Sequence, residues 1–249
     1  MITLKHITKS FEGRVVLTDI NATFEKGKTN LIIGQSGSGK TVLLKSIVGL
    51  HDVDDGEIYY NDILFNRLSF SGKKEIRKRM GMLFQGAALF DSYTVEENVM
   101  FPLDMFTDKS QEEKLDRVNF CLKRVNIINA NHLYPAEISG GMKKRVAIAR
   151  AIALNPEFLF CDEPNSGLDP KTSIVIDHLI REITEEYDTT TIINTHDMNS
   201  VISMGDKVIF IYEGKKWWEG ANTDILDSDN KELNEFVFSS ELTKKIKGV

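Results

Sequence analysis

Residues 34–41 have the sequence GQSGSGKT, and this loop separates two stretches with different hydrophobic periodicity. Before it, residues 29–34 form the short apolar run TNLIIG, which predicts a buried strand. After it, residues 40–50 place apolar side chains at helical spacing. The loop fits the pattern G-x-x-x-x-G-K-[ST] at Gly34, Gly39, Lys40 and Thr41. A strand, a glycine-rich loop and a helix in this order predict a phosphate-binding loop in an α/β domain.

The chemistry of phosphate binding explains the residue types in this loop. Glycines let backbone N–H groups wrap phosphate oxygens, and the N-terminus of the following helix favours negative charge. Lys40 is expected to reach the β- and γ-phosphate oxygens of a nucleotide, and Thr41 to offer its hydroxyl to Mg²⁺. The alternative is a glycine-rich turn with a solvated lysine. The residues expected to contact ATP are Gly34, Gln35, Ser36, Gly37, Ser38, Gly39, Lys40, Thr41 and Val42.

A second constellation is FLFCDEP, residues 158–164, an apolar strand that ends at two adjacent carboxylates. We expect this strand to lie next to the strand that precedes the glycine-rich loop. A carboxylate at that position can hold Mg²⁺ through water, and a second one can polarise an attacking water molecule. Asp162 is therefore predicted to bind the metal and Glu163 to act as the general base. The alternative is a strand that simply ends in a polar turn.

A second pair of glycines occurs in ISGGM, residues 138–142, directly before a run with helical character. Glycine at the start of a helix is costly unless the bare backbone has a function. The hydroxyl of Ser139 and the amides of Gly140 and Gly141 predict a second anion site at a helix N-terminus. Two such sites cannot easily serve one nucleotide in a small domain. A two-fold dimer could place this segment of each chain over the nucleotide bound by the other.

Composition excludes several other classes of protein. The 249 residues are 41% hydrophobic, which is enough for a substantial core, and the net charge of -6 argues against a nucleic-acid-binding protein. Cys121 and Cys161 lack the spacing of a zinc site or a disulfide scaffold, so a reducing compartment is expected. No run approaches the ~20 apolar residues of a membrane span. The sequence predicts a soluble or peripheral membrane protein.

The remaining pattern predicts the order of secondary structure. Residues 1–26 and 56–64 alternate apolar and polar side chains, as antiparallel strands do. Residues 111–133 and 140–154 have helical spacing, so the middle of the chain is predicted to be mainly helical. The other expected elements are parallel strands at 158–162 and 190–195, a helix at 172–187 between them, and a hairpin at 207–220 that turns at Glu213 and Gly214.

These motifs together resemble those of the ATP-binding subunits of ABC transporters, over nearly the whole chain. The matching segments, in family order, are GQSGSGKT as Walker A, Gln85 as the Q-loop, ISGGM as the signature, FLFCDEP as Walker B, SGLD (166–169) as the D-loop and His196 as the switch histidine. The resemblance implies that Gln85 and His196 assist catalysis, that Gln85 also approaches the metal, and that Phe11 stacks on adenine. The alternatives are a structural histidine and a core phenylalanine at these positions.

The resemblance also implies the fold. We expect one ABC ATPase domain of class α/β over residues 1–249, with a RecA-like P-loop NTPase core. An N-terminal antiparallel β layer and this core would occupy residues 1–85 and 155–220. A helical signature subdomain would occupy residues 86–154, and a C-terminal extension residues 221–249.

Two features resemble the subfamily that drives Mla, or MCE-type, phospholipid transporters. Met142 follows the glycine pair where most of the family has glutamine, and residues 81–103 match the subfamily over GMLFQGAALFDSYTVEENVMFPL. In the implied complex the chain binds peripherally at the cytoplasmic face of the inner membrane. Its implied partners are a second copy in an ATP-sandwich homodimer, an integral-membrane permease, an MCE-domain lipid-binding protein and a small regulatory subunit, without nucleic acid.

Several alternatives stay open at this point. One other function is the ATPase of a polar-solute ABC importer, and another is a soluble ABC ATPase outside transport, although the chain lacks the coiled-coil arms common in such proteins. KKEIRKR (73–79) is interpreted as a solvated helix face, with contact to anionic lipid headgroups as the alternative. The residues that form either core or a docking groove for a permease are Leu83, Phe84, Leu89 and Phe90.

Overall fold

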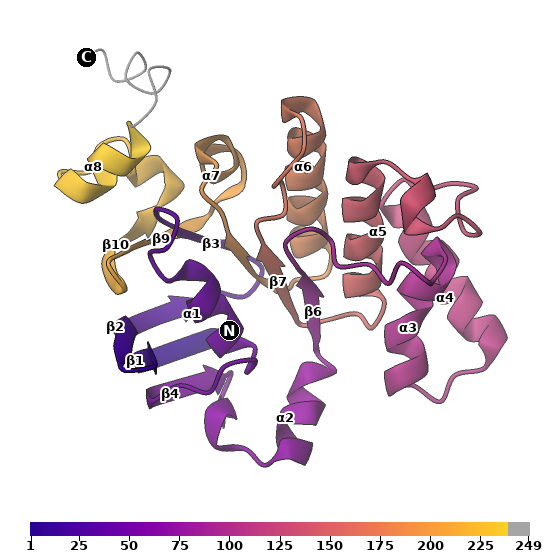
Figure 1. Cartoon of the computed structure of the whole chain (residues 1–249), viewed down its shortest axis with the longest axis horizontal. Coiled ribbons are helices and arrows are strands. Elements are labelled where there is room, and N and C mark those ends of the chain that lie inside the picture. The colour runs from indigo at the N-terminus through magenta and orange to yellow at the C-terminus, as the bar shows by residue number, and fades with distance from the viewer. Residues whose placement is uncertain (239–249) are drawn as a thin grey trace.

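The computed structural model describes residues 1–238, which contain two β-sheets with helices around them (Figure 1). The first sheet is antiparallel and N-terminal, as the alternating pattern predicted. Its strands, in the order β2-β1-β4-β5, are β1 (Ile2–Phe11), β2 (Arg14–Phe24), β4 (Asp55–Tyr60) and β5 (Ile63–Leu64). On β1, Ile2 and Leu4 are buried while Lys5 is exposed, so one face of this sheet is covered.

The second sheet, within the same described range, has the strand order β10-β9-β3-β8-β7-β6. The strands from β9 to β6 are parallel, and β10 is antiparallel to β9. Their bounds are β3 (Thr29–Ile33), β6 (Met80–Leu83), β7 (Phe158–Asp162), β8 (Thr190–Asn194), β9 (Lys207–Tyr212) and β10 (Lys215–Ala221). The α/β class predicted from the sequence is confirmed.

One detail of the predicted sheet was wrong. Strand β7, which ends at Asp162, is not next to β3, because β8 lies between them. Both β7 and β8 are short, fully buried apolar runs, and such runs do not specify which neighbour they pair with. The carboxyl ends of β3, β8 and β7 still meet at one edge of the sheet, because the three strands are parallel.

Alternate residues of β3 belong to two different hydrophobic cores. Ile32 packs with the antiparallel sheet and with helix α1 (Lys40–Ile47), which contacts strands of both sheets. Leu31 and Ile33 point the other way, into a second core covered by the remaining long helices. The short central strand is therefore buried on both faces, and all of its residues are buried.

The middle of the chain is mainly helical, as predicted, but the helix expected over 111–133 is shorter. Helix α4 ends at Arg124, and Asn126 and Asn129 then adopt left-handed backbone angles, with φ of 55° and 56°. The loop that follows supplies the carbonyl oxygen of Leu133 to the amide of Val95, at the start of α3. The long helices, with α4 among them, are α3 (Val95–Phe106), α4 (Gln111–Arg124), α5 (Gly140–Ile152) and α6 (Pro170–Glu186).

Helices α3, α4 and α5 lie together at one end of the molecule (Figure 1). They share one continuous core with the sheet, since Val99, Val118 and Val146 belong to the same cluster as Leu31. Helix α5 contacts α3 and α4 on one side and β6 and α6 on the other. The division of the chain at residues 86 and 154 stays a prediction.

The C-terminal hairpin turns at Glu213 and Gly214, as predicted, and both residues have positive φ, 47° and 73°. This is the backbone of the tight turn that joins two strands. A side chain at Gly214 would lie 2.3 Å from the carbonyl oxygen of Val16, so glycine is needed for close approach as well. The amide of Gly214 donates to the carbonyl of Ser38 at 3.2 Å. The hairpin thus supports the glycine-rich loop.

Two short helices complete the described chain beyond β8, namely α7 (Met198–Met204) and α8 (Lys231–Val237). Leu233 and Val237 of α8 join the core beneath the sheet. Within the predicted C-terminal extension, residues 231–237 thus form a helix packed against the core, and residues 239–249 lie outside the described range. Within residues 1–238, no helix has both the length and the apolar character needed to cross a membrane.

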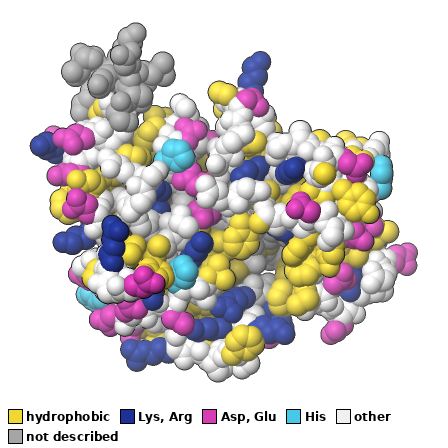
Figure 2. Space-filling view, viewed as in Figure 1, with side chains coloured by type: hydrophobic (Ala, Val, Ile, Leu, Met, Phe, Trp, Pro, Cys, Tyr) yellow, Lys and Arg dark blue, Asp and Glu magenta, His cyan; other side chains and the backbone are white. Residues whose placement is uncertain are grey.

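The four apolar residues after β6 divide between the two alternatives. Leu83 is completely buried in the core, whereas Phe90 is 41% exposed. Phe90 packs against Tyr93 and Phe101, at ring-centroid distances of 5.2 and 4.8 Å. Figure 2 shows hydrophobic side chains gathered on the face where α3, α4 and α5 lie. Core and surface roles are therefore combined in one short segment.

The basic segment 73–79 lies mostly on helix α2 (Phe70–Arg77), where Figure 2 shows Lys and Arg side chains gathered. Lys73 pairs with Asp52 at 3.2 Å, and Lys78 with Glu75 at 2.9 Å. Arg77 donates to the carbonyl oxygen of Gly49 at 2.7 Å. These contacts favour the interpretation of a surface helix held by local polar contacts.

Candidate functional site

The glycine-rich loop connects β3 to α1 and is shaped by glycines at its two ends. Gly34 has φ of 149°, and a side chain there would lie 2.2 Å from the carbonyl oxygen of Ile211. Gly39 has φ of 107°, and its side chain would meet Leu17 at 2.8 Å. Only glycine fits these positions, which form the first and last glycines of the predicted motif.

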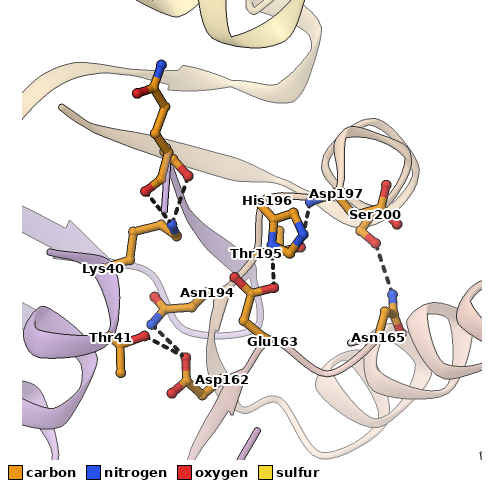
Figure 3. A network of polar contacts seen from close by, with 12 residues as sticks. Lys40, Thr41, Asp162, Glu163, Asn165, Asn194, Thr195, His196, Asp197 and Ser200 are labelled. Carbon is orange, nitrogen blue, oxygen red and sulfur yellow. Dashed lines mark hydrogen bonds and ion pairs between the residues drawn. The ribbon is translucent and has the colours of Figure 1, made fainter. Parts of the chain in front are cut away.

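Lys40 begins helix α1 and folds back over the loop that precedes it. Its Nζ donates to the carbonyl oxygens of Gly34 and Gln35, at 2.8 and 3.0 Å (Figure 3). The side chain is 7% exposed, and burial lowers the pKa of Lys40, while the nearby carboxylates of Glu163 and Asp162 act in the opposite direction. A buried ammonium with only carbonyl partners is well placed to bind phosphate oxygens.

Two further observations fit a phosphate group at this loop. The cap residue of α1 is Gly39, which has no side chain to satisfy the first amides of the helix. Ser38 Oγ is buried and, among the described residues, has no hydrogen-bond partner. Backbone amides at a helix N-terminus and an orphaned hydroxyl are donors that an anion satisfies. The loop therefore fits a nucleotide phosphate.

Asp162 lies at the carboxyl end of β7 and is 3% exposed. Its Oδ1 accepts hydrogen bonds from Thr41 Oγ1 at 3.3 Å and from Asn194 Nδ2 at 3.1 Å (Figure 3). Hydroxyl, carboxylate and amide oxygens are the hard ligands that Mg²⁺ prefers. The donor set around Thr41 and Asp162 thus fits the predicted metal. Sequence reasoning missed Asn194, although its place opposite Asp162 in the parallel register is the signal that could have found it.

Glu163 follows β7 directly and has the left-handed φ of 50°, which is uncommon for a residue with a side chain. Its amide donates to the carbonyl of Asn194 at 3.0 Å, and its carbonyl accepts from the amide of Ser166 at 3.2 Å. Lys144 Nζ, from helix α5, donates to the same carbonyl at 3.4 Å. These bonds hold the strained backbone and turn the carboxylate away from the sheet.

The carboxylate of Glu163 meets His196, which follows strand β8. Oε2 of Glu163 lies 2.8 Å from Nδ1 of His196 (Figure 3). The glutamate side chain is 14% exposed, whereas the histidine side chain is 61% exposed. The structure therefore brings together Lys40, Thr41, Asp162, Glu163 and His196, which the sequence had placed in one site.

Gln85 is only loosely connected to this group. It lies two residues beyond β6, the strand next to β7, and its side chain is exposed. Within residues 1–238, no described hydrogen bond joins it to Asp162 or Glu163. The metal and catalytic roles expected of Gln85 stay predictions.

A cavity of about 620 Å³ opens beside the glycine-rich loop. Its lining is formed by Arg14, Val15, Val16, Gln35, Ser36, Gly37, Ser38, Tyr212, Glu213 and Gly214. Sequence reasoning missed the contribution of Arg14 and Tyr212, because nothing in their local sequence indicates that β2 and the C-terminal hairpin meet at the loop. The space is large enough for a nucleoside next to the phosphate-binding amides.

Phe11, the expected adenine-stacking residue, is 40% exposed on the same hairpin as Arg14. It is not a core residue, which argues against the alternative considered for it. The Nζ of Lys9 lies 5.0 Å from its ring centroid, and the ring of His51 packs edge-on at 5.2 Å. Phe11 does not line the cavity itself. Adenine stacking by Phe11 stays a prediction.

The ISGGM segment forms the N-terminus of α5, as predicted. Ser139 is the cap residue, and its Oγ accepts from the amide of Met142 at 3.3 Å. A side chain at Gly141 would lie 2.7 Å from Cγ2 of Thr172, so a larger residue at this position would force Thr172 to shift. Met142 is half-buried and packs against the core behind the helix start. Its apolar side chain thus anchors the segment without occupying the exposed surface.

The two anion sites lie apart within one chain. Figure 1 shows α1 and α5 well separated, with α6 and β7 between them. Ser139 is exposed, whereas the amides around Lys40 are buried at the edge of the central sheet. A single nucleotide on the glycine-rich loop therefore leaves the ISGGM segment of the same chain free for another contact.

Comparison with known proteins places this site in context. The family described as "ABC transporter" matches residues 17–166, which is more than half of the chain. The chain is 38% identical to the intermembrane phospholipid transport system ATP-binding protein MlaF of Haemophilus influenzae, over 95% of this chain and 90% of that protein. It is 35% identical to the methionine import ATP-binding protein MetN of Campylobacter jejuni, over 97% of this chain and 76% of that protein.

The fold also matches solved structures. A dimeric post-hydrolysis structure of the ATP-binding cassette MJ0796, bound to ADP and Pi, superposes with a TM-score of 0.81 and 35% identity, covering 89% of this chain and 99% of that one. The chain belongs to the ABC transporter family and is an ATP-hydrolysing, ATP-binding subunit of the ABC type.

Proposed function

We propose that ATP binds with its phosphates on residues 34–42 and is hydrolysed by water that Glu163 activates. The observation that carries this proposal is the convergence of Lys40, Asp162 and Glu163 at the carboxyl edge of three parallel strands. Ligands of open parallel sheets bind at this edge. Replacing Glu163 by glutamine tests it, because the amide cannot accept the proton while its shape is retained.

Each residue has a distinct task in this proposal. The ammonium of Lys40 leaves its carbonyl partners for the phosphate oxygens and offsets the negative charge that develops there. Glu163 takes the proton of the attacking water, and His196 holds one of its two carboxylate oxygens, leaving the other for the water. Mg²⁺, when bound by Thr41, Asp162 and Gln85, would neutralise the phosphate oxygens. The products are ADP and phosphate.

We further propose that two copies of the chain form the complete site. The separation of α1 from α5 supports contact between the ISGGM segment and the nucleotide of a second copy. A relative of 35% identity has been solved as a dimer, and self-association through two identical interfaces is the usual symmetry of such pairs. ATP would favour the closed dimer through its higher affinity for it, and hydrolysis would remove that bias.

The transported substrate proposed for the complex is phospholipid. Similarity to MlaF over nearly the full length of both chains supports this assignment, together with Met142 and residues 81–103. In this proposal the dimer binds peripherally to an integral-membrane permease at the cytoplasmic face of the inner membrane. The permease exchanges phospholipid with an MCE-domain lipid carrier, and a small regulatory subunit accompanies the ATPase.

A polar-solute importer is the second candidate, because two MetN relatives are 35% and 36% identical to this chain. Purification of the chain from its native membrane, followed by identification of the associated proteins and lipids, separates the two. An MCE-domain protein and bound phospholipid are expected. A permease that co-purifies with a solute-binding protein would assign the importer function instead, and isolation without any permease would indicate an ATPase outside transport.

A further inference from the structure

A buried polar cluster lies behind the catalytic residues and joins three segments of the chain. Asn165 is in the loop after β7, Asp177 is on α6, and Ser200 is in the first turn of α7. These three residues, named here the Asp177 cluster, are separate from the residues that face the nucleotide. Asn165 lies two residues after Glu163, and Ser200 lies four residues after His196. The cluster therefore connects the two segments that carry the proposed base and its histidine partner.

The hydrogen bonds of the Asp177 cluster have a defined direction. Asn165 Nδ2 donates to Asp177 Oδ1 at 2.7 Å and to Ser200 Oγ at 3.0 Å (Figure 3 shows the latter bond). Ser200 Oγ donates to Asp177 Oδ2 at 2.7 Å. The carboxylate fixes the orientation of the asparagine amide, because the reverse orientation would place two oxygens against each other. Both oxygens of Asp177 are thus engaged, one by each segment.

Asp177 is a buried carboxyl group whose desolvation costs free energy. It is 5% exposed, and burial raises its pKa above the ordinary value despite the two hydrogen bonds. Its two described hydrogen-bond donors are neutral. Burying a carboxylate without a cationic partner costs free energy that an apolar side chain of similar size would not. What the carboxylate provides that an apolar side chain would not is two acceptor oxygens, one for Asn165 and one for Ser200.

The segment that carries His196 has other constraints as well, since the amide of Thr195 donates to the carbonyl oxygen of Ile32 at 3.1 Å and Arg181 donates to the carbonyl oxygen of Ser203 at 3.2 Å. The side chain of His196 is 61% exposed, and α7 is a short helix capped by Asp197, which accepts from the amide of Asn199 at 2.9 Å. The Glu163 backbone is strained, as its φ of 50° indicates. A contact of 2.8 Å between two such side chains needs both backbones to be held in register.

We infer that Asp177 is a positioning residue for hydrolysis, which holds the loop after Glu163 and the helix after His196 at a fixed separation. This inference rests on the proposed roles of Glu163 and His196. Asp177 touches neither the nucleotide nor the reacting atoms. Its carboxylate serves as a common acceptor for Asn165 and Ser200, so the two segments move as one unit.

The test compares Asp177→Leu, which keeps the volume but removes both acceptor oxygens, with Asp177→Asn, which keeps one. In the purified full-length chain, kcat for ATP should fall about 10- to 100-fold in the leucine variant, while KM stays at the wild-type value. The asparagine variant should recover part of the loss. Ser200→Ala should lower kcat as well, and the double variant Asp177→Leu/Ser200→Ala should be no worse than Asp177→Leu alone, because both lesions break one unit.

A matched control lies two turns further along the same helix. Thr184 is 1% exposed and shares a hydrogen bond of 2.7 Å with Thr191, so Thr184→Val disturbs a buried polar contact remote from the site. This variant should lower the melting temperature but not kcat. If Asp177→Leu does not fold, the kcat values of Asp177→Asn and Ser200→Ala decide the matter.

Three results would overturn the inference. The first is a wild-type kcat in Asp177→Leu. The second is a loss of kcat in Thr184→Val as large as that in Asp177→Leu. The third is a loss of kcat in the double variant that equals the product of the losses in the two single variants. Measuring Glu163→Gln in the same series keeps the two proposals apart. If Glu163→Gln has the wild-type kcat, the role of Glu163 as general base is rejected. If Glu163→Gln loses activity but the Asp177 and Ser200 variants keep the wild-type kcat, only the positioning role of Asp177 is rejected.

Discussion

His196 Nδ1 lies 2.8 Å from Glu163 Oε2, so the residues that follow two adjacent parallel strands meet beyond the edge of the sheet. The glutamate is mostly buried and the histidine mostly exposed. The exposed histidine therefore covers the carboxylate on its solvent side. In the proposed mechanism, the second carboxylate oxygen receives a proton from water.

Glu163→Gln should reduce kcat by about 10²–10⁴-fold, since a general base typically contributes that much to the rate. ATP binding should be retained, because the glutamine keeps the side-chain volume and Lys40 is unchanged. The variant should accumulate as an ATP-held dimer, which light scattering with and without ATP detects. Wild-type turnover would place the base elsewhere, and a monomer in saturating ATP would argue against closure by ATP.

Lys40→Ala should weaken ATP binding and abolish turnover while the chain stays folded. The ammonium is buried against carbonyl oxygens, and its removal relieves a desolvation cost rather than breaking an ion pair. Isothermal titration with ATP and thermal melting measure the two effects. Lys45→Ala, on the same helix, is the matched control and should bind ATP as the wild type does. Equal losses in both variants would reject the specific role of Lys40.

Cysteines placed at Ser139 and Ser36 should form a disulfide between two chains when ATP is present. Both residues are exposed, and Ser36 is preferable to the buried Ser38 for this purpose. The buried thiols of Cys121 and Cys161 are first replaced, although burial raises the pKa of Cys121 to about 11 and so disfavours its reactive thiolate. Bonds found only within one chain, or formed equally without ATP, would contradict the shared site.

Gly141→Ala should lower the melting temperature, because the new methyl group would lie 2.7 Å from Cγ2 of Thr172. Such overpacking costs about 1–3 kcal/mol. Thr172→Ser removes that methyl group but keeps the hydroxyl that bonds Asp169, so the double variant should regain most of the stability. Gly140→Ala is the control, since its nearest neighbour would be 3.8 Å away. Equal melting temperatures for the two alanine variants would show that Thr172 does not restrict position 141.

Several features of the site were predictable because they depend on local backbone chemistry. Gly34 and Gly39 stand where the loop needs backbone angles or close approaches that only glycine permits, and Lys40 follows at the start of the helix. The turn at Glu213 and Gly214 is of the same kind. Apolar alternation also identified the antiparallel strands, because one face of that sheet is covered.

Other features depended on contacts between distant segments, and local patterns carry little information about these. Strand β8 lies between β3 and β7 in the sheet. Both β7 and β8 are buried apolar runs, so either of them could have paired with β3 as far as their sequences show. Helix α4 ends at Arg124, and the loop that follows it bonds the start of α3. The helical spacing of apolar residues continues through residues 125–133, so the sequence pattern did not indicate that the helix ends at Arg124.

From the sequence alone it could be predicted which residues carry the chemistry, since the glycine-rich loop, the paired carboxylates and the second helix start each have a residue pattern typical of phosphate or metal binding. The residues that surround them became apparent only in the folded chain. Asn194 reaches Asp162 through the register of two parallel strands, and Arg14 and Tyr212 reach the loop from opposite ends of the chain. The buried carboxylate of Asp177 joins two segments that its own helix does not contain. Such supporting contacts arise from the packing of whole elements, which no short stretch of sequence encodes.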